Sequence, residues 1–287
     1  RNDTIHTSIF DAVVACNGHF ETPRLPEISG LNTFPGTVMH SVDYDKPEDY
    51  KDLVVAILGA RSSGVDISMD LSKFAKKIYL IHLGEKSSTK YPDNIEEIKG
   101  TITACSSDGS VEIDNGETLY AEVVMFCTGY LQTLPFLDPK CGINVSMHNH
   151  VTPLYKHIFN IQYPSMFFIG ICVKLCPFPN YALQAKLVWS VLTGRTTLPS
   201  KEEMLQDEQK ECQKRIEAGM AKNMMHVLGV NYQLQYCETI AELAGVPCTY
   251  TPAIHSLYSH INATRPLHLA TYRMKNFEID GDKWKEV

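Results

Sequence analysis

Apolar residues in the first half of the chain form two continuous runs separated by a helical pattern. The first run, Val54–Leu58, enters a turn at Gly59, and a pattern of helical period follows over residues 63–75. The second run is Ile78–Leu83. A strand, a turn, a helix and a second strand within about 30 residues make a βαβ unit, whose two strands run parallel. We therefore expect an α/β fold organised around this unit.

Shorter apolar runs predict further strands on both sides of this unit. Phe10–Cys16, Val123–Phe126 and Met166–Ile169 have the composition of buried strands. Residues 101–121 instead alternate apolar and polar positions, and Asp-Gly and Asn-Gly pairs interrupt them. Such pairs favour tight turns, so this stretch indicates hairpins inserted into a nucleotide-binding domain.

The last third of the chain has the start and stop signals of three helices. We expect the first over Tyr181–Leu192, with Asn180 as its N-cap. The second begins after Ser200, where Glu203 completes a capping box, and the third covers Tyr232–Ala244. The chain should therefore end in a helix-rich part.

Composition limits the class of protein and of ligand. The 287 residues are 44% hydrophobic and 21% charged, as in an ordinary globular protein, and the formal net charge is -7. Dispersed Lys and Arg residues and a negative net charge argue against a nucleic-acid partner, so we expect a small-molecule ligand. Nine cysteines without C-x-x-C spacing indicate mostly free, buried thiols and favour a reducing compartment.

The sequence signals for membrane insertion and glycosylation are compatible with more than one cellular compartment. The sequence has no apolar run of about 18 residues, so we expect no membrane span in this chain. Three N-x-S/T sequons, at Asn2, Asn144 and Asn262, would permit glycosylation in the secretory pathway. We expect a cytoplasmic or endoplasmic-reticulum-associated protein, with secretion as the alternative.

The turn between the first strand and the helix has the position of a dinucleotide-binding fingerprint. It reads G-A-R-S-S-G, with Arg61 where G-x-G-x-x-G has its middle glycine. Gly59 would make the tight turn, and Gly64 would let helix and strand pack closely. Backbone amides near Ser62 and Ser63 would face a pyrophosphate. The alternative is a turn that serves only helix packing.

Residues after the second strand bear on the choice between NADH and NADPH. Lys86 and Ser87 could hold a 2'-phosphate, as a cation does in NADP-specific sites. Glu85 stands beside them, and an acid at this place is typical of NAD-specific sites. We expect NADPH, and the alternative is a solvated charged loop.

Two motifs carry a resemblance to a known family. Residues 34–44 fit F-x-G-x-x-x-H-x-x-x-Y, with His40 and Tyr44 at its last two fixed positions. Phe126–Tyr130 reads F-C-T-G-Y and differs from F-A-T-G-Y by one cysteine. Both motifs, in this order, resemble those of flavin-containing monooxygenases, and further similar segments extend over essentially the whole chain.

The resemblance implies an α/β flavoprotein with two dinucleotide-binding domains, in which a Rossmann-like NADPH domain is inserted into a larger FAD domain. Residues 1–48 and 128–287 would belong to the FAD domain, and residues 49–127 to the NADPH domain.

The same resemblance implies FAD and NADPH as cofactors, and it adds Thr128, Gly129, Gly170 and Gln184 to the cofactor-binding residues. The family's first glycine turn, which holds FAD, has no counterpart among residues 1–30. We therefore expect that a preceding segment or a second polypeptide completes the FAD site. A homo-oligomer is a further open alternative.

The implied reaction is a monooxygenation. NADPH reduces FAD, O2 then gives a flavin C4a-hydroperoxide, and this oxygenates a soft nitrogen or sulfur of a small amine or sulfide. We expect an enzyme similar to N,N-dimethylaniline monooxygenase, acting on amines, alkaloids or xenobiotics. Tyr44 favours this branch over ketone-oxidising relatives, whose motif ends in tryptophan. The alternative is a catalytically silent nucleotide-binding module.

The histidines of the chain do not have the spacing of a metal site, and one of them, His40, has two alternative roles. The role of His40 stays open between catalysis and hydrogen-bonded packing. His148, His150, His255 and His260 lack the accompanying cysteine or carboxylate spacing of a metal site, so we expect no metal.

Overall fold

The computed structural model describes residues 6–86 and 90–287, which form two compact units. Unit 1 contains residues 6–19, Leu131–Ser259 and Phe277–Glu286. Unit 2 contains Phe20–Tyr130, His260–Asn276 and the last residue. Each unit is therefore assembled from separate stretches of the chain.

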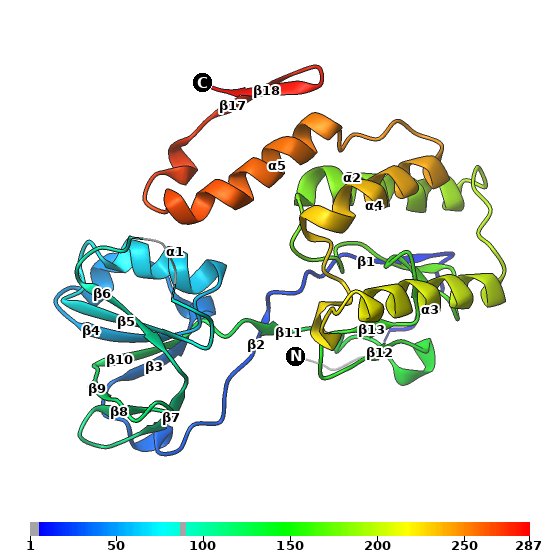
Figure 1. The fold of residues 1–287 in the computed structure, drawn as a ribbon. Coiled ribbons are helices and arrows are strands. Elements are labelled where there is room, and N and C mark those ends of the chain that lie inside the picture. Colours follow the sequence, from blue (N-terminus) through cyan, green and yellow to red (C-terminus); the bar gives the residue numbers. More distant parts are fainter. Residues whose placement is uncertain (1–5, 87–89) are drawn as a thin grey trace. The chain divides into compact units, whose positions relative to one another are not determined.

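Unit 2 is built on a parallel sheet. Among the described residues this sheet has five strands, in the order β3 (Thr37–His40), β10 (Val123–Phe126), β4 (Val54–Leu58), β5 (Lys77–His82) and β6 (Ile95–Lys99). All neighbouring strands run parallel. The predicted βαβ unit is confirmed, with α1 (Ser62–Leu71) between β4 and β5 in the chain (Figure 1). Because β3 pairs with β10, residues 20–48 share this unit with residues 49–127.

Helix α1 ends earlier than the sequence predicts. The chain turns after Leu71, where the amides of Phe74 and Ala75 both donate to the carbonyl oxygen of Leu71. The side-chain amide of Asn94 donates to the carbonyl oxygens of Ser72 at 3.0 Å and Ala75 at 2.9 Å. These bonds come from a distant residue, so a local pattern cannot reveal them.

Both faces of the parallel sheet are buried, which explains the continuous apolar runs of its strands. On one face, Val55 and Ile57 pack with Leu71 of α1. On the other face, Ala56 and Leu58 belong to a core that includes an antiparallel sheet. Each fully buried aliphatic side chain contributes about 1.5–3 kcal/mol relative to an exposed one.

The antiparallel sheet confirms the predicted hairpins. Its strands are β7 (Ile102–Cys105), β8 (Ser110–Ile113) and β9 (Thr118–Tyr120). Gly109 and Gly116 lie in the two turns with φ of 87° and 90°, a conformation that favours glycine. Unit 2 also contains β2 (Thr22–Pro23) and the 3-10 helices Leu31–Thr33, Ser41–Asp43, Pro47–Tyr50, Arg265–Leu267 and Tyr272–Met274.

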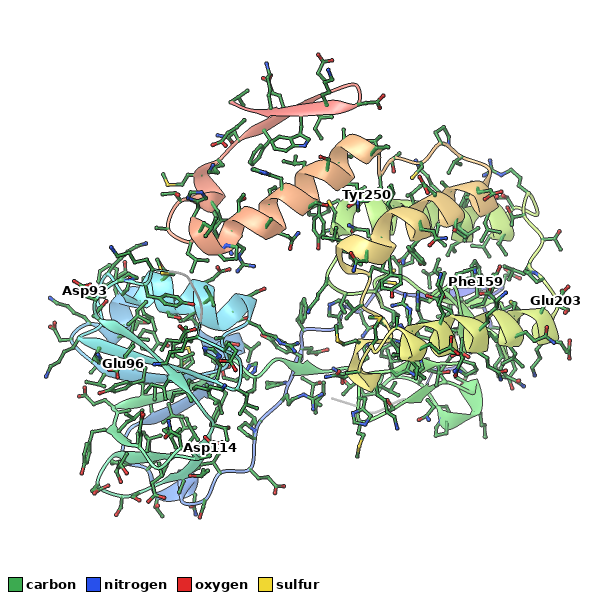
Figure 2. The ribbon with its side chains drawn as sticks, viewed as in Figure 1. Asp93, Glu96, Asp114, Phe159, Glu203 and Tyr250 are labelled. Atoms are coloured by element: carbon green, nitrogen blue, oxygen red, sulfur yellow. The ribbon has the colours of Figure 1, made fainter. Side chains whose placement is uncertain are left out.

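Unit 1 contains a mixed sheet. Its order is β1 (Val13–Ala15), β16 (Met166–Phe168), β15 (Phe159–Asn160) and β14 (Leu154–Tyr155), with only β1 and β16 parallel. Phe159, labelled in Figure 2, is fully buried and packs edge-to-face on Phe167. Shorter elements of unit 1 are β12 (Asn144–Val145), β13 (Val151–Thr152), β17 (Phe277–Asp280), β18 (Lys283–Glu286) and the 3-10 helices Pro139–Cys141 and Lys222–Met224. Strand β11 (Tyr130–Leu131) spans the chain position at which unit 2 ends and unit 1 resumes.

Helices occupy much of the second half of the chain. They are α2 (Pro177–Leu192), α3 (Lys201–Glu217), α4 (Gly229–Ala244) and α5 (Pro252–Thr264). Helices α2 and α4 run side by side (Figure 1), with Leu183, Leu187 and Ile240 in their shared core. Helix α5 is not among the helices predicted from the sequence, although Pro252 at its first position is a typical helix start.

Asn180 is not the N-cap of α2, which corrects the prediction. The helix begins at Pro177, with Cys176 in the N-cap position. Proline suits this place because the first amides of a helix have no intrahelical acceptor to lose. Asn180 is therefore inside the helix, where it is buried and its Nδ2 donates to the Sγ of Cys237 at 3.3 Å.

The predicted capping box at the start of α3 is confirmed. The hydroxyl of Ser200 accepts from the amide of Glu203 at 3.2 Å, and the Glu203 carboxylate accepts from the amide of Ser200 at 2.8 Å. Figure 2 labels Glu203 at this end of α3. Helix α4 begins at Gly229, before the predicted start, and ends at Ala244 as predicted.

All nine cysteines are free thiols, as the sequence predicts, but only four of them are buried, so the expectation of mostly buried thiols is wrong. Within the described residues, no helix combines the length and apolar character that crossing a bilayer requires. Of the sequon asparagines, Asn144 and Asn262 are exposed, and Asn2 lies outside the described residues.

Candidate functional site

The carboxyl ends of the parallel strands lie at one edge of the sheet in unit 2. The register pairs Phe126, the last residue of β10, with His40 of β3 and Leu58 of β4. The glycine turn follows Leu58, and the two family motifs leave the sheet after His40 and Phe126. Open α/β sheets bind ligands at the carboxyl ends of their strands, so this edge is the candidate nucleotide site.

Gly59 and Gly64 give the turn a form that larger residues would not allow. Gly59 has a φ of 110°, and a Cβ on it would lie 2.5 Å from the carbonyl oxygen of Cys127. A Cβ on Gly64 would lie 1.7 Å from the carbonyl oxygen of Gly59. The first glycine lets the turn pass close to the end of β10, and the last brings α1 onto the turn, as a dinucleotide fingerprint requires.

The N-terminus of α1 presents backbone donors at this turn. Arg61 is the N-cap residue, and its side chain makes no capping hydrogen bond. Amides at the first positions of a helix, here those of Ser62 and Ser63, have no acceptor within the helix. Arg61, Ser62 and Ser63 are exposed, and the first turn contains no acidic residue. These residues fit the pyrophosphate of a dinucleotide.

Residues that the sequence analysis did not consider lie beside this helix. Arg265 donates to the hydroxyl of Ser62 at 3.3 Å and to the carboxylate of Asp66 at 2.9 Å. Asp66 also accepts from Tyr272 at 3.2 Å and from Arg273 at 2.7 Å. No local signal marks these contacts, because 199 positions separate Arg265 from Asp66. They tie residues 260–276 to α1 and bring positive charge near the turn.

The loop after β5 contains the residues expected at the 2'-phosphate. Lys86 is exposed, and Ser87 lies outside the described residues. Glu85, the acid that favours NADH in the sequence, forms an ion pair with Lys99 of β6. The hydrogen bond and the charge of Lys99 hold the pKa of Glu85 below its ordinary value. Glu85 thus has a counter-ion of its own, which makes the loop compatible with a phosphate.

Both ring nitrogens of His40 form hydrogen bonds with backbone groups. Its Nδ1 accepts from the amide of Val42 at 3.1 Å, so Nε2 carries the proton and donates to the carbonyl oxygen of Gly129 at 3.0 Å. The side chain is buried, and burial lowers its pKa. The ring also packs edge-on against Tyr130. These contacts describe a neutral histidine that links β3 to the segment after β10.

Tyr44 connects the same motif to α1. Its hydroxyl donates to the carboxylate of Asp70 at 2.8 Å, and its ring lies 5.9 Å from that of Tyr50. Burial, followed by the hydrogen bond to Asp70, raises the pKa of Tyr44. The phenol therefore stays protonated and acts as a donor to the nucleotide helix.

The second motif is held by residues from the beginning of unit 2. The hydroxyl of Thr128 donates to the carbonyl oxygen of Arg24, and the amide of Arg24 donates to the carbonyl oxygen of Gly129 at 2.9 Å. Gly129 has a φ of 81°. Burial raises the pKa of the Cys127 thiol to about 12, so this cysteine is no nucleophile.

Gly170 and Gln184 lie in unit 1, where they bond to each other. The amide of Gly170 donates to Oε1 of Gln184 at 3.1 Å, and Nε2 of Gln184 donates to the hydroxyl of Tyr236 at 3.0 Å. Gln184 is fully buried. The side-chain amide of Gln184 therefore fixes the backbone at Gly170, after the end of β16.

Unit 1 also contains a buried hydrogen-bonded chain that the sequence did not predict. The amide of Val151 donates to Nε2 of His226 at 2.9 Å, so His226 donates through Nδ1 to His157 at 3.0 Å. His157 then donates through Nε2 to Glu211 at 3.1 Å, and Arg215 donates to the same carboxylate at 2.8 Å. One backbone amide thus fixes the tautomers of two imidazoles, and burial keeps the pKa of His226 well below its ordinary value.

Comparison with protein families matches residues 1–87 and 91–260 to the model of flavin-binding monooxygenase-like proteins. This chain belongs to that family. A curated relative is flavin-containing monooxygenase FMO GS-OX-like 2 of Arabidopsis thaliana, 39% identical over 255 residues, which are 86% of this chain and 54% of the relative. The chain thus spans about half the length of the curated relatives that it matches.

Solved structures of the family share the fold. The S-allyl-L-cysteine S-oxygenase of Allium sativum is 37% identical, with a TM-score of 0.82 over 95% of this chain and 62% of that one. Tmm of a Pelagibacter strain is 23% identical, with a TM-score of 0.84 over all of this chain and 63% of that one. At this identity the likeness shows a shared fold and nothing further. The expected fold class is confirmed: the chain has the α/β fold of FAD- and NADPH-binding flavin monooxygenases. The cofactors of the family are FAD and NADPH.

Proposed function

We propose that this monooxygenase uses NADPH and O2 to oxygenate a soft sulfur atom of a small molecule, with tertiary amines as a second substrate class. The observation that carries the proposal is the 37% identity, over 95% of this chain, to an enzyme named for the S-oxygenation of S-allyl-L-cysteine. Tyr44 at the end of the first motif supports the same branch. A thioether is a soft, uncharged nucleophile, and an apolar site suits it.

In this proposal unit 2 binds NADPH at the carboxyl edge of its parallel sheet. Amides at the start of α1, together with Arg61, would hold the pyrophosphate, because an anion is stabilised at a helix N-terminus. Lys86 would pair with the 2'-phosphate, while Lys99 neutralises the neighbouring Glu85. Unit 1, together with the rest of the FAD domain, would hold the flavin.

When bound, the flavin supplies the redox chemistry by accepting a hydride from NADPH and activating O2. The residues described here bind and position. His40 holds the end of β10 through Gly129, and Tyr44 holds the motif on α1 through Asp70. Because both ring nitrogens of His40 are bonded to the backbone, we assign it no proton transfer in the reaction.

Product analysis tests this function. The chain, combined with the segment or polypeptide expected to complete the FAD site, would be supplied with FAD, NADPH and O2 and offered a methyl thioether, a tertiary amine and cyclohexanone. We expect sulfoxide as the main product, some N-oxide and no lactone. Lactone formed while the sulfide stays untouched would disprove the proposal. A completed protein that still takes up no flavin, and so lacks absorbance near about 450 nm, would instead support the silent nucleotide-binding module.

A further inference from the structure

Three potential metal ligands meet in unit 1, and none of them is among the residues assigned to the nucleotide. Nε2 of His150 lies 4.0 Å from Oε1 of Glu208 and 3.9 Å from Sγ of Cys212. The same sulfur lies 4.0 Å from Oε1 of Glu208. All three side chains are half-buried. The ligand atoms therefore form a nearly equilateral triangle.

The size of this triangle suits a transition metal ion. An equilateral triangle with sides of about 4 Å has its centre about 2.3 Å from each corner (4 divided by √3), which equals the Zn–S distance and slightly exceeds Zn–N and Zn–O distances. A small inward movement of His150 and Glu208 would complete the contacts. The three residues also line a cavity of about 10 Å³, which is room for a single small occupant.

The three potential ligands come from two separate segments of the chain, each held by its own local structure. Glu208 and Cys212 are four residues apart on α3 and share one face of that helix. His150 comes from the turn before β13, where its amide donates to the hydroxyl of Ser146 at 3.2 Å. Thr152 donates to Oε1 of Glu208 at 2.7 Å, and such an outer hydrogen bond orients a ligating carboxylate.

Neighbouring groups neither fill the site nor block it. Nε2 of His226 already accepts from the amide of Val151, and its Nδ1 bonds to His157, so this imidazole is no fourth ligand. Arg215 directs its charge to Glu211 and to a backbone carbonyl. A fourth position would therefore be left for water, as in open zinc sites with three protein ligands.

We propose that His150, Glu208 and Cys212 bind a divalent zinc-type metal ion, which fastens α3 to the turn before β13. Sequence spacing does not reveal this site, because 62 positions separate His150 from Cys212. The proposal is independent of the oxygenation chemistry, and its test needs neither cofactor nor substrate.

Cobalt is the probe for the test, because Co2+ replaces Zn2+ in such sites and a cobalt–thiolate bond absorbs in the near ultraviolet. Tag-free protein stripped with a chelator would be titrated with Co2+, and the cobalt then displaced with Zn2+. We expect one ion per chain and a thiolate band that zinc abolishes. Absence of stoichiometric binding by the unaltered protein would overturn the proposal.

Variants assign the ligands. Cys212→Ser should lose the thiolate band and weaken Zn2+ binding at least tenfold, about the loss that even an outer partner of a ligand causes. Glu208→Gln should weaken binding while keeping the band. Cys141→Ser, at another half-buried thiol, is the matched control and should change neither. A band retained in Cys212→Ser, or lost in Cys141→Ser, would contradict the assignment.

Discussion

Nε2 of His40 donates to the carbonyl oxygen of Gly129 at 3.0 Å, and this bond joins the ends of the neighbouring strands β3 and β10. Replacing His40 by Ala would leave the Val42 amide without its acceptor and remove one donor from Gly129. We expect the free energy of unfolding to fall by about 1–3 kcal/mol, the cost of leaving buried polar groups unpaired. Urea denaturation of the two proteins measures it.

His40→Gln separates packing from catalysis, because glutamine can still donate to Gly129. It should recover part of the lost stability, and kcat should keep the pH profile of the unaltered enzyme. A stable His40→Gln enzyme with a displaced pH profile would show instead that this histidine takes part in proton transfer.

Acid should weaken the contribution of His40. Burial holds its pKa in the folded protein below the value of 6.5 that it has when exposed. As the pH falls through about 6.5, the unfolded chain therefore binds a proton that the folded chain does not, and the free energy of unfolding decreases. The stability difference between the unaltered protein and His40→Gln should be smaller at pH 5.5 than at pH 7.5. An equal or larger difference at the lower pH would contradict the neutral, buried state.

Gly64→Ala should be among the most damaging substitutions in unit 2. The added Cβ would lie 1.7 Å from the carbonyl oxygen of Gly59, so α1 or the turn must move. We expect a loss of about 1–3 kcal/mol or more, as in other overpacked sites, together with weaker NADPH binding. Thermal unfolding and NADPH titration measure the two effects. Ser63→Ala, at an exposed neighbour, is the control for stability. An unchanged Gly64→Ala protein would mean that helix and turn pack less closely than described.

The elements that the sequence predicts correctly are those whose whole signal lies in one local stretch. The runs of β4 and β10 are apolar throughout because both faces of their sheet are buried, and the glycines of the turn meet backbone atoms directly. The capping box of α3 is equally local, since Ser200 and Glu203 bond to each other.

Local sequence patterns do not predict features that form between residues far apart in the chain. Helix α1 ends early through bonds to Asn94, and the contacts of Arg265 with α1 come from the other end of the chain. His150 has no cysteine or carboxylate nearby in sequence, although folding brings Glu208 and Cys212 beside it. The wrong N-cap at Asn180 has another origin, because Asn180 and Pro177 both carry local helix-start signals and the helix begins at the proline.

Lys86 offers a test of cofactor choice. Lys86→Ala should lower kcat/KM for NADPH about tenfold or more and leave that for NADH nearly unchanged, because only NADPH has a 2'-phosphate to pair with the ammonium group. Lys51→Ala, an exposed lysine before β4, is the matched control. Equal losses with both cofactors would remove Lys86 from the 2'-phosphate site.

Lys99 should influence the same selectivity without touching the phosphate. Lys99→Ala would leave Glu85 without its counter-ion, and the exposed carboxylate would then repel a 2'-phosphate. We expect NADPH use to fall by a few-fold, with a larger effect at low ionic strength because salt screens exposed charges. The double variant Glu85→Gln with Lys99→Ala should recover the loss. No recovery would show that Lys99 acts through another contact.

The inner strand β10 is the last of the five strands to appear along the chain, although it lies between β3 and β4. During synthesis β4, α1, β5 and β6 can associate as neighbours in sequence, whereas β3 must wait about 80 residues for its partner. The slow step in folding unit 2 should therefore be the pairing of β10 with both β3 and β4. His40, Leu58 and Phe126 meet only then, so the nucleotide edge of the sheet forms only when β10 has joined its neighbours.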